Sequence, residues 1–139
     1  MPVYNAGDFL REAIESILNQ TYQNFEFIII DDASTDDSWK IISAYKRKFP
    51  SKIKAIRLKN NLNMGGDAAG NVGFKHASGE FIARMDADDI SKPTRLEKQT
   101  HYMLFHPDIS VLGSCADVID KEGKIVGEKI VPKSHTELY

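Results

Sequence analysis

The sequence predicts an α/β fold with a mostly parallel, doubly wound sheet, and three observations point to it. Apolar residues follow two patterns in turn: helical spacing, and short continuous runs typical of strands buried in a parallel sheet. Capping residues, glycines and prolines separate the successive segments. Two of the short runs end in carboxylates, at the strand ends where open α/β sheets bind their ligands. Such a series of strand, helix and strand is expected to form right-handed crossovers.

Alternating patterns define the first four elements. Leu10, Ile14 and Ile17 recur at helical spacing and indicate an amphipathic helix. Ser34 and Asp37 match a capping box in front of a second helix. In chain order we expect a helix over about residues 7–20, a strand from Phe25 to Ile30, a helix that stops before Pro50, and a strand from Ile53 to Leu58.

The rest of the chain continues the alternation. Gly79 is expected to end a helix, and Pro93 suits the first turn of another. Glu122 and Gly123 lie between two apolar runs and predict a turn. The expected elements are a helix through Ala69–Ala77, a strand over residues 80–86, a helix after Pro93, and two strands over residues 109–120 and 124–131.

Composition limits the classes of function. With 139 residues the chain is expected to form a single domain over residues 1–139. A net charge of −2 gives no basic surface for nucleic acid. The apolar runs are too short to cross a membrane, and no signal peptide opens the sequence. Cys115 is the only cysteine; we expect it to be buried and inert, and the lack of a second cysteine fits a reducing compartment.

The most informative segment ends in Asp86, Asp88 and Asp89, after the mostly apolar residues 81–85. Two carboxylates about 4 Å apart repel by about 4 kcal/mol at an effective dielectric near 20, so a bound cation would stabilise them. Mg²⁺ and Mn²⁺ prefer oxygen ligands, often one or two carboxylates together with the phosphates of a nucleotide. A second acidic pair, Asp31 and Asp32, follows the strand predicted at 25–30. The sequence therefore predicts a site for a nucleotide and a metal at one edge of the sheet.

At this point the residues resemble a known family, the family 2 glycosyltransferases, whose fold is called GT-A. The resemblance covers about residues 1–115, and it is the order of the motifs that makes it specific. The motifs that carry it are Pro2-Val3-Tyr4-Asn5, Asn19-Gln20-Thr21-Tyr22, Asp31-Asp32, Ser34-Thr35-Asp36-Asp37-Ser38, Asn60-Asn61, Asn71, Ala77-Ser78-Gly79-Glu80, Asp86-Ala87-Asp88-Asp89 and Pro93-Thr94-Arg95-Leu96.

The resemblance assigns roles to individual positions in binding a nucleotide sugar. Pro2, Val3 and Tyr4 correspond to a loop against the nucleotide base, where Tyr4 offers a stacking face. Asp32 corresponds to the carboxylate that accepts a hydrogen bond from the base. Asn71 corresponds to a further nucleotide-sugar-binding residue. Asp31 is open to two interpretations, a share in binding the base or capping of the next helix.

The acidic cluster corresponds to the family's metal-binding D-x-D motif. Asp88 is expected to bind the metal directly, and Asp86 to lie nearer the ribose while also serving the metal. Asp89 is equally consistent with a role in orienting the loop. Asp36 and Asp37 are interpreted differently, because carboxylates in the first turn of a helix offset its positive end without any ligand.

The resemblance implies an inverting glycosyltransferase that moves a sugar from a nucleoside diphosphate to an acceptor hydroxyl. It implies Mg²⁺ or Mn²⁺ as cofactor, a UDP-sugar as the expected donor, and a saccharide or lipid-linked acceptor, in bacterial cell-surface polysaccharide synthesis. We expect a cytoplasmic location, at the inner face of the membrane if missing segments provide a peripheral attachment. No nucleic acid is expected as a partner.

Three departures from the family pattern bear on these expectations. The apolar run that normally precedes Pro2 is absent, the acceptor half is absent, and Gly70 stands where the family often has arginine. The chain is therefore expected to be truncated at both ends. The catalytic general base stays unknown and is expected outside the chain, because Asp117 and Asp120 resemble exposed strand and turn residues.

Two alternatives to an active transferase are kept. One is a nucleotide-binding module without catalysis, which donor hydrolysis by the purified chain would distinguish. The other is a response-regulator receiver domain, which also places acidic residues at strand ends. A receiver domain requires a lysine at the end of a late strand, and Lys121 and Lys133 lack that setting.

Overall fold

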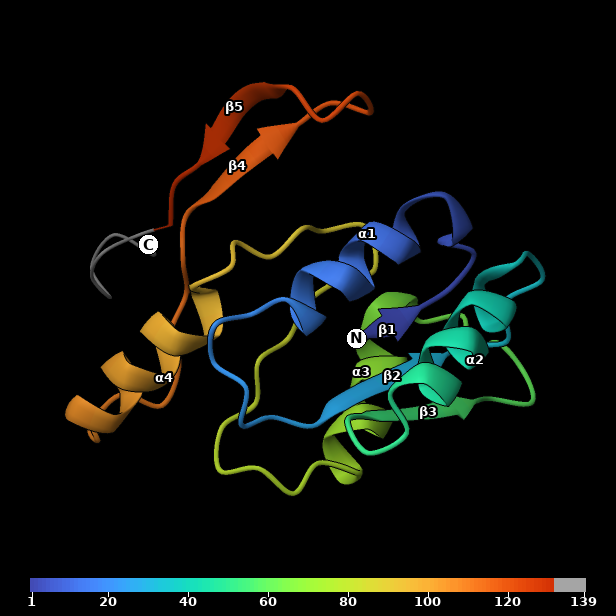
Figure 1. Cartoon of the computed structure of the whole chain (residues 1–139), viewed down its shortest axis with the longest axis horizontal. Helices are drawn as coiled ribbons and strands as arrows, with labels where there is room; N and C mark the ends of the chain where they lie inside the picture. The colour runs from blue at the N-terminus through green and yellow to red at the C-terminus, as the bar shows by residue number, and fades with distance from the viewer. Residues whose placement is uncertain (132–139) are drawn as a thin grey trace. The chain divides into compact units, whose positions relative to one another are not determined.

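The computed structural model describes residues 1–131, and the chain divides into two compact units, residues 1–100 and the residues from 101 on. The first unit is built on a parallel sheet with the strand order β1-β2-β3 (Figure 1). Its strands are β1 (Pro2–Val3), β2 (Phe27–Asp31) and β3 (Ile53–Arg57). Pro2 lies beside Ile30, and Phe27 lies beside Ile53. This unit confirms the predicted α/β class.

Three helices cover the two faces of the sheet, α1 (Gly7–Leu18), α2 (Ser38–Lys48) and α3 (Gly65–Lys75). α2 packs on β2 and β3, and α1 packs on α2. α3 packs on β1 and β2. Side chains along β2 alternate accordingly: Ile29 belongs to the core shared with α1 and α2, whereas Ile30 faces Gly73 of α3. The result is a three-layer arrangement with the sheet in the middle.

Within residues 1–131, four large apolar side chains of the core are 0% exposed, and full burial of such a side chain contributes roughly 1.5–3 kcal/mol. They are Leu10 and Ile14 of α1, Ile29 of β2 and Ile42 of α2. Leu10 and Ile14 lie on the face that the helical spacing predicted. The predicted helix over residues 7–20 is confirmed as Gly7–Leu18, and the predicted strand at 53–58 as Ile53–Arg57.

The predicted capping box is wrong. α2 begins at Ser38, and Asp37 at its cap position makes no side-chain capping hydrogen bond. The hydroxyls of Ser34 and Ser38 instead accept hydrogen bonds from the backbone amides of Asn5 and Ala6, each at 3.0 Å. These buried serines therefore hold the loop between β1 and α1.

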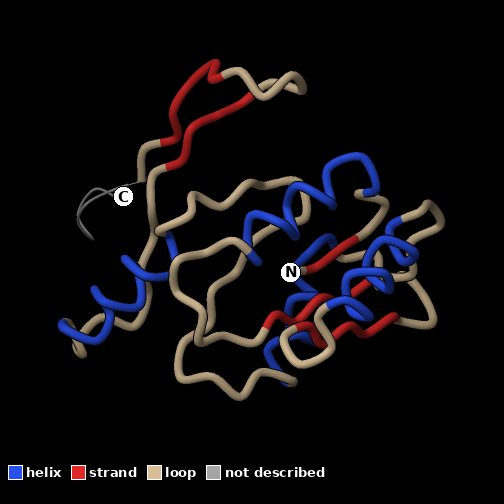
Figure 2. The backbone as a smooth tube through the Cα atoms, viewed as in Figure 1, coloured by secondary structure: helices blue, strands red, loops and turns tan. Residues whose placement is uncertain are grey.

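The predicted strand over residues 80–86 is also wrong. These residues form a loop within the long connection between α3 and α4 (Arg95–Phe105), drawn as a tan tube in Figure 2. β1 pairs with β2 and forms the edge of the sheet on that side. Because β1 has only two residues, it offers few backbone groups with which residues 80–86 could pair as a further strand. Met85 and Ala87 pack into the core instead, each 6% exposed.

β1 itself corrects one expectation about the start of the fold. The family resemblance assigns Pro2 and Val3 to a loop, yet Pro2–Val3 forms a strand parallel to β2. The amide of Ile30 donates to the carbonyl of Met1 at 3.0 Å, and that of Asp32 donates to Val3 at 2.8 Å. The short strand therefore places Tyr4 and the following loop at the end of the sheet.

The second unit contains a hairpin of β4 (Ala116–Ile119) and β5 (Ile125–Lys129), which confirms the two predicted strands in shorter form. The carboxylate of Asp120 accepts hydrogen bonds from the amides of Glu122 and Lys124, and Gly123 has a positive φ of 80°. Cys115 is exposed, so the prediction of a buried thiol is wrong.

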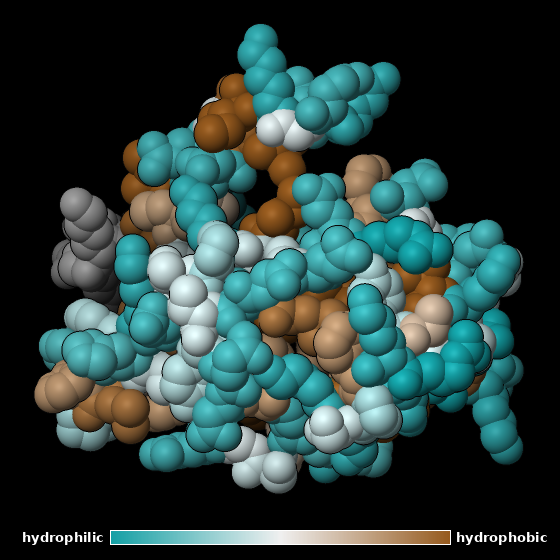
Figure 3. Space-filling view, viewed as in Figure 1, coloured by the Kyte–Doolittle hydropathy of each residue, from teal (hydrophilic) through white to brown (hydrophobic). Residues whose placement is uncertain are grey.

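Both strands of the hairpin are solvent-exposed along their whole length, and several of their exposed side chains are apolar. The cysteine prediction failed for this reason, because an apolar sequence pattern indicates burial only where another element covers it. Figure 3 shows apolar and polar residues mixed on the face that it draws. None of the helices in the described part of the chain is long and apolar enough to span a membrane.

Candidate donor-binding site

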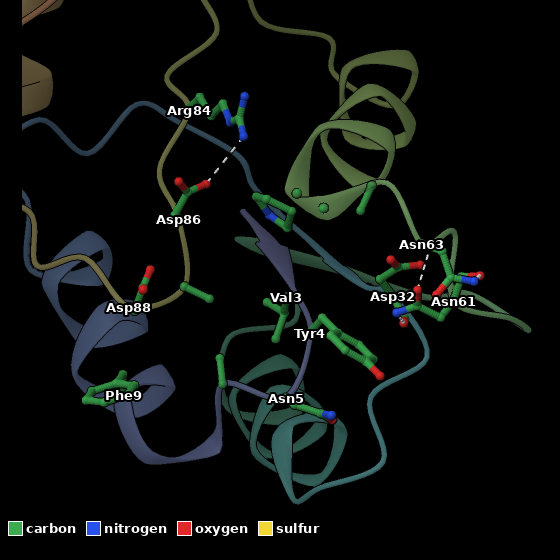
Figure 4. Close-up of a pocket in the computed structure, with 16 residues that line it drawn as sticks. Val3, Tyr4, Asn5, Phe9, Asp32, Asn61, Asn63, Arg84, Asp86 and Asp88 are labelled. Carbon is green, nitrogen blue, oxygen red and sulfur yellow. Dashed lines mark hydrogen bonds and ion pairs between the residues drawn. The ribbon is translucent and has the colours of Figure 1, made fainter.

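A pocket of about 530 Å³ lies in the first unit, at the end of the sheet reached by the carboxyl ends of β1 and β2. Figure 4 shows Asp32, Asn61 and Asn63 at one end of it, and Arg84, Asp86 and Asp88 at the other. The loop after β1 runs between the two ends. We call these the Asp32 end and the D-x-D end. This position is where parallel α/β sheets bind ligands.

Asp32 is held rigidly at its end of the pocket. Its side chain is nearly buried, and its Oδ1 accepts a hydrogen bond from the amide of Leu62 at 2.9 Å. The side-chain amide of Asn61 donates to the backbone carbonyl of Asp32 at 3.0 Å. The second carboxylate oxygen, Oδ2, accepts no hydrogen bond from a described residue. Asp32 therefore offers one oriented acceptor to a ligand.

Asp31 does not share this role, because it faces the opposite side of β2. It is fully buried, and its Oδ2 lies 3.1 Å from Nε of Arg57, its neighbour on β3. Neither of its oxygens receives a well-aligned hydrogen bond from the described residues. Arg57 in turn donates to the carbonyl of Ser34 at 2.9 Å and lies over the ring of Trp39. Asp31 thus belongs to the scaffold behind the pocket.

The loop after β1 forms the middle of the pocket wall. Tyr4 is 53% exposed there, whereas Pro2 and Val3 are buried. Asn5 has a positive φ of 49°, and its side-chain oxygen accepts a hydrogen bond from the amide of Thr35 at 2.8 Å. Because Asn5 fixes the turn, the aromatic face of Tyr4 is available to a planar ligand.

Asp86 and Asp88 both line the D-x-D end. They are exposed, whereas the intervening Ala87 and the preceding Met85 are buried. This alternation sends both carboxylates to the pocket side of the loop, although the loop is not a strand. Asp89 lies outside the lining residues and its amide donates to the carbonyl of Asp86 at 3.4 Å.

Arg84 is the one cationic side chain among the described lining residues. Its Nη1 lies 2.7 Å from Asp67 of α3, and its Nη2 lies 3.6 Å from Asp86. The hydrogen bond to Asp67 raises the pKa of Arg84, and the charge of Asp86 adds to this effect. With Asp32, Asp86 and Asp88 opposed only by Arg84, the lining carries an excess of negative charge.

A divalent cation fits this end of the pocket. Within residues 1–131 no group of three or more His, Cys, Asp or Glu side chains could hold a metal. The protein would therefore supply only two carboxylates to an ion at this end, those of Asp86 and Asp88. Magnesium sites commonly use one or two carboxylates together with substrate phosphates and water. The surplus negative charge of the lining also favours a cation. A bound diphosphate would add further negative charge, which the cation would offset.

The N-terminal end of α3 contributes to the wall as well, through Gly65, Gly66 and Ala69. Gly65 has a positive φ of 59°. A Cβ atom on Gly66 would lie 3.2 Å from Pro2 and 3.4 Å from Nη2 of Arg84. The two glycines therefore let the helix end approach the pocket, where its free amides favour an anionic group.

The structure brings together most of the residues that the sequence singled out, namely Pro2, Val3, Tyr4, Asp32, Asp86 and Asp88. Asn71 is exposed on α3 and does not line the pocket, so its assigned role stays a prediction. Sequence reasoning gave no role to Phe9, Asn63 or Arg84. For Arg84 a signal existed, its position two residues before Asp86.

The whole chain matches one protein family. The family model described as glycosyl transferase family 2 matches residues 1–137, so the chain belongs to this family. The EpsE protein of Bacillus subtilis (strain 168), itself only provisionally named a glycosyltransferase, is 42% identical over 95% of this chain. WfaP of Escherichia coli, named a UDP-Glc:alpha-D-GlcNAc-diphosphoundecaprenol beta-1,3-glucosyltransferase, is 44% identical over 72% of the chain. The chain spans 46% of EpsE and 38% of WfaP.

Solved structures confirm the GT-A fold. S. aureus TarS (1-349), solved in complex with UDP, superposes with a TM-score of 0.68 at 30% identity, over 76% of this chain and 31% of its own. The mannosyltransferase PcManGT from Pyrobaculum calidifontis, in complex with GDP-Man and Mn²⁺, gives a TM-score of 0.58 at 26% identity, over 64% of this chain and 26% of its own. Membership of this family is incompatible with a receiver domain.

Proposed function

We propose that this chain forms the donor-binding part of an inverting glycosyltransferase that uses a UDP-sugar. One observation carries the proposal: a single pocket joins an oriented buried carboxylate, Asp32, to the exposed pair Asp86 and Asp88. A nucleoside diphosphate sugar has a matching order of groups, with a base at one end and a charged diphosphate toward the other. Relatives and neighbours named with UDP-Glc, UDP and GDP-Man support a nucleotide-sugar donor.

The nucleotide base is assigned to the Asp32 end. Oδ2 of Asp32 would accept a hydrogen bond from a ring N–H, while the Leu62 amide keeps the carboxylate in place. Tyr4 would lie against the base and exclude water from one face. A uracil ring supplies such an N–H and is small enough to leave room for the ribose toward Asp86.

The diphosphate is assigned to the D-x-D end. Asp86 and Asp88 would hold Mg²⁺ or Mn²⁺, with Asp88 as the more direct ligand, and the ion would stabilise negative charge on the departing phosphate. Arg84 would contribute a second positive charge near the same phosphates. The N-terminal end of α3 would add oriented backbone amides.

The acceptor and the biological setting extend the same proposal. We assign the acceptor to a saccharide or a lipid-linked sugar, in bacterial cell-surface polysaccharide synthesis on the cytoplasmic side of the membrane. The name of WfaP, which includes a diphosphoundecaprenol acceptor, supports this setting. None of the described residues is assigned as the general base. The alternative is therefore a part that binds the nucleotide without catalysis of its own, and the experiment must distinguish it from an active transferase.

Calorimetry of the purified chain with UDP, GDP and dTDP, each with and without Mn²⁺, tests the donor assignment. We expect UDP to bind most tightly and Mn²⁺ to strengthen its binding by at least about tenfold, or 1.4 kcal/mol. Failure of all three nucleotides to bind in the presence of Mn²⁺ would contradict the proposal. Hydrolysis of UDP-sugars by the same sample would distinguish an active enzyme from a binding part.

A matched pair of variants gives the control. Replacing both Asp86 and Asp88 with Asn should remove the Mn²⁺ effect, because the metal loses its carboxylates. The Asp37→Asn variant should keep it, since that carboxylate is 77% exposed just before α2 and pairs only with Lys40 among the described residues. Equal behaviour of the two variants would rule out the D-x-D assignment.

A further inference from the structure

Gln20 follows α1 and is buried, with only 1% of its surface exposed. Its side-chain nitrogen donates to the Ser91 hydroxyl at 3.2 Å and to the carbonyl of Lys92 at 2.9 Å. Its side-chain oxygen accepts a hydrogen bond from the amide of Leu96 at 2.9 Å. A side chain beside α1 therefore holds the segment that follows the D-x-D motif, more than seventy positions later in the chain.

Neighbouring residues repeat this connection. The hydroxyl of Ser16 accepts a hydrogen bond from the amide of Ser91 at 3.0 Å, and the amide of Thr21 donates to the carbonyl of Pro93 at 2.9 Å. Ser91 is itself buried, 6% exposed. The segment after the D-x-D motif is thus fixed to α1 and to the residues just after it, by side chain and backbone together.

Arg95, the first residue of α4, holds the backbone on the N-terminal side of the D-x-D motif. Its Nη2 donates to the carbonyl of Arg84 at 2.8 Å, and its Nε donates to Gln99 at 3.2 Å. Burial lowers the pKa of Arg95, and the nearby carboxylate of Asp89 opposes that shift. Because the guanidinium is planar and donates in two directions, it fixes the backbone of residue 84 relative to α4.

The loop between these two anchors has few backbone hydrogen bonds of its own among the described residues. Across residues 85–90 the described backbone hydrogen bonds outside regular elements include only the long one from Asp89 to Asp86, at 3.4 Å. Met85 and Ala87 are buried, whereas both metal-facing carboxylates are exposed. The course of the loop therefore depends on the core packing of Met85 and Ala87 and on where its two ends are held.

We propose that Gln20 and Arg95 are positioning residues for the metal site, because they hold the D-x-D loop from its two sides. We call them the anchor residues. Neither one lines the pocket, so they act through the loop and do not touch a ligand. The inference rests on the proposed function, which supplies the metal and the donor, and it adds residues that set the spacing of Asp86 and Asp88.

The physical reason is the geometric demand of the ion. Mg²⁺ requires near-ideal octahedral geometry, and a ligand loop that moves must be ordered when the ion binds. Residues that orient metal ligands typically change metal affinity by about 10–100-fold when they are replaced. A base bound at the Asp32 end should be insensitive to the same replacements, because Asp32 is held by Val3, Asn61 and Leu62.

The test measures UDP binding by calorimetry with and without Mn²⁺ in Arg95→Met, Arg95→Lys and Gln20→Met. In Arg95→Met and Gln20→Met we expect metal-free UDP affinity to stay within about twofold and the Mn²⁺ enhancement to fall by about tenfold or more. Arg95→Lys keeps one donor group and should recover part of the enhancement. Arg47→Met is the matched control for the arginine variants, since its side chain is exposed on α2.

The other outcomes are separable. An unchanged Mn²⁺ enhancement in both anchor variants would overturn the inference and leave the proposed function standing. A uniform loss of metal-free and metal-dependent affinity, or loss of cooperative melting in both variants, would overturn it by assigning these residues to the stability of the fold. A wild-type chain that binds UDP without any Mn²⁺ effect would contradict the proposed function, and the inference with it.

Discussion

The two ends of the donor pocket differ in how their carboxylates are held. At the Asp32 end the side chain is 4% exposed, follows directly after β2 and accepts a backbone hydrogen bond from Leu62. At the D-x-D end Asp86 and Asp88 are exposed on a loop, and Asp86 is held by an ion pair with Arg84 at 3.6 Å. The first end is fixed mainly by backbone hydrogen bonds from β1 and from the loop after β3, and the second by side chains.

This difference suggests a division of labour in binding. A rigid acceptor costs no ordering free energy when a ligand arrives, so the Asp32 end is suited to selecting the base. At the D-x-D end Arg84 is the one described cationic lining residue beside Asp86 and Asp88, so a bound cation would stabilise the negative charge there. The predictions below separate the two ends.

The largest effect is expected from the scaffold behind the Asp32 end. Arg57→Ala would leave Asp31 buried without its cation, and an uncompensated buried charge typically costs about 3 kcal/mol or more. Because 45% of the Arg57 side chain is exposed, the expected loss is close to the lower value of about 3 kcal/mol. Urea unfolding of the variant measures this loss. Arg47→Ala on the exposed face of α2 should be nearly neutral, and equal stability of the two variants would refute the role given to the Asp31–Arg57 pair.

A smaller effect is expected from Asp32→Asn, which keeps the size of the side chain and removes its charge. UDP affinity should fall by about 1.5–3 kcal/mol, the range of a hydrogen bond to a charged group. The loss should be equal with and without Mn²⁺, because this end is independent of the metal. Calorimetry under the two conditions is the measurement, and an unchanged affinity would place the base elsewhere.

Asp88→Ala should act on the other end alone. Nucleotide and Mn²⁺ together should raise the melting temperature of the wild-type chain more than either does alone. The variant should lose this synergy, which corresponds to at least about 1.4 kcal/mol for a tenfold metal effect, and should keep metal-free UDP binding. If the full metal-dependent shift survives in Asp88→Ala, the assignment of the metal to the D-x-D motif is wrong.

The smallest effect concerns a contact remote from both ends. Glu26 accepts hydrogen bonds from the hydroxyl and amide of Ser78 at 2.7 and 2.6 Å, which lower its pKa below 4.5. A lowered pKa in the folded state means that the carboxylate form stabilises the fold, so this contribution is present above pH 4.5 and is lost as the pH falls through the folded-state pKa.

Glu26 is exposed, so the contribution is expected to be about 0.5 kcal/mol at most. Thermal melts of the wild type and Glu26→Gln, from about pH 3 to about pH 7, measure it as a difference in the pH dependence of the melting temperature. UDP binding at either end should not change. A variant that alters nucleotide affinity would mean that the segment after α3 is coupled to the pocket.

The local patterns of the sequence predicted most elements correctly, because helical spacing and buried apolar runs depend on neighbours along the chain. They failed at residues 80–86, where an apolar run suggested a strand. Whether such a run becomes a strand depends on a partner edge, and β1 supplies only two residues. They failed again at Cys115 for the same reason, since burial requires a covering element.

The sequence by itself determined the family and singled out Asp32, Asp86 and Asp88 as candidate site residues, since they belong to motifs whose residues lie close together in the chain. Only the tertiary structure decided that Asp31 and Asp32 face opposite sides of β2, that Arg84 joins the pocket, and that Gln20 holds the segment beyond the D-x-D loop. These facts depend on contacts between residues far apart in sequence. Such contacts form only when the layers pack, and a pattern of neighbouring residues does not encode them.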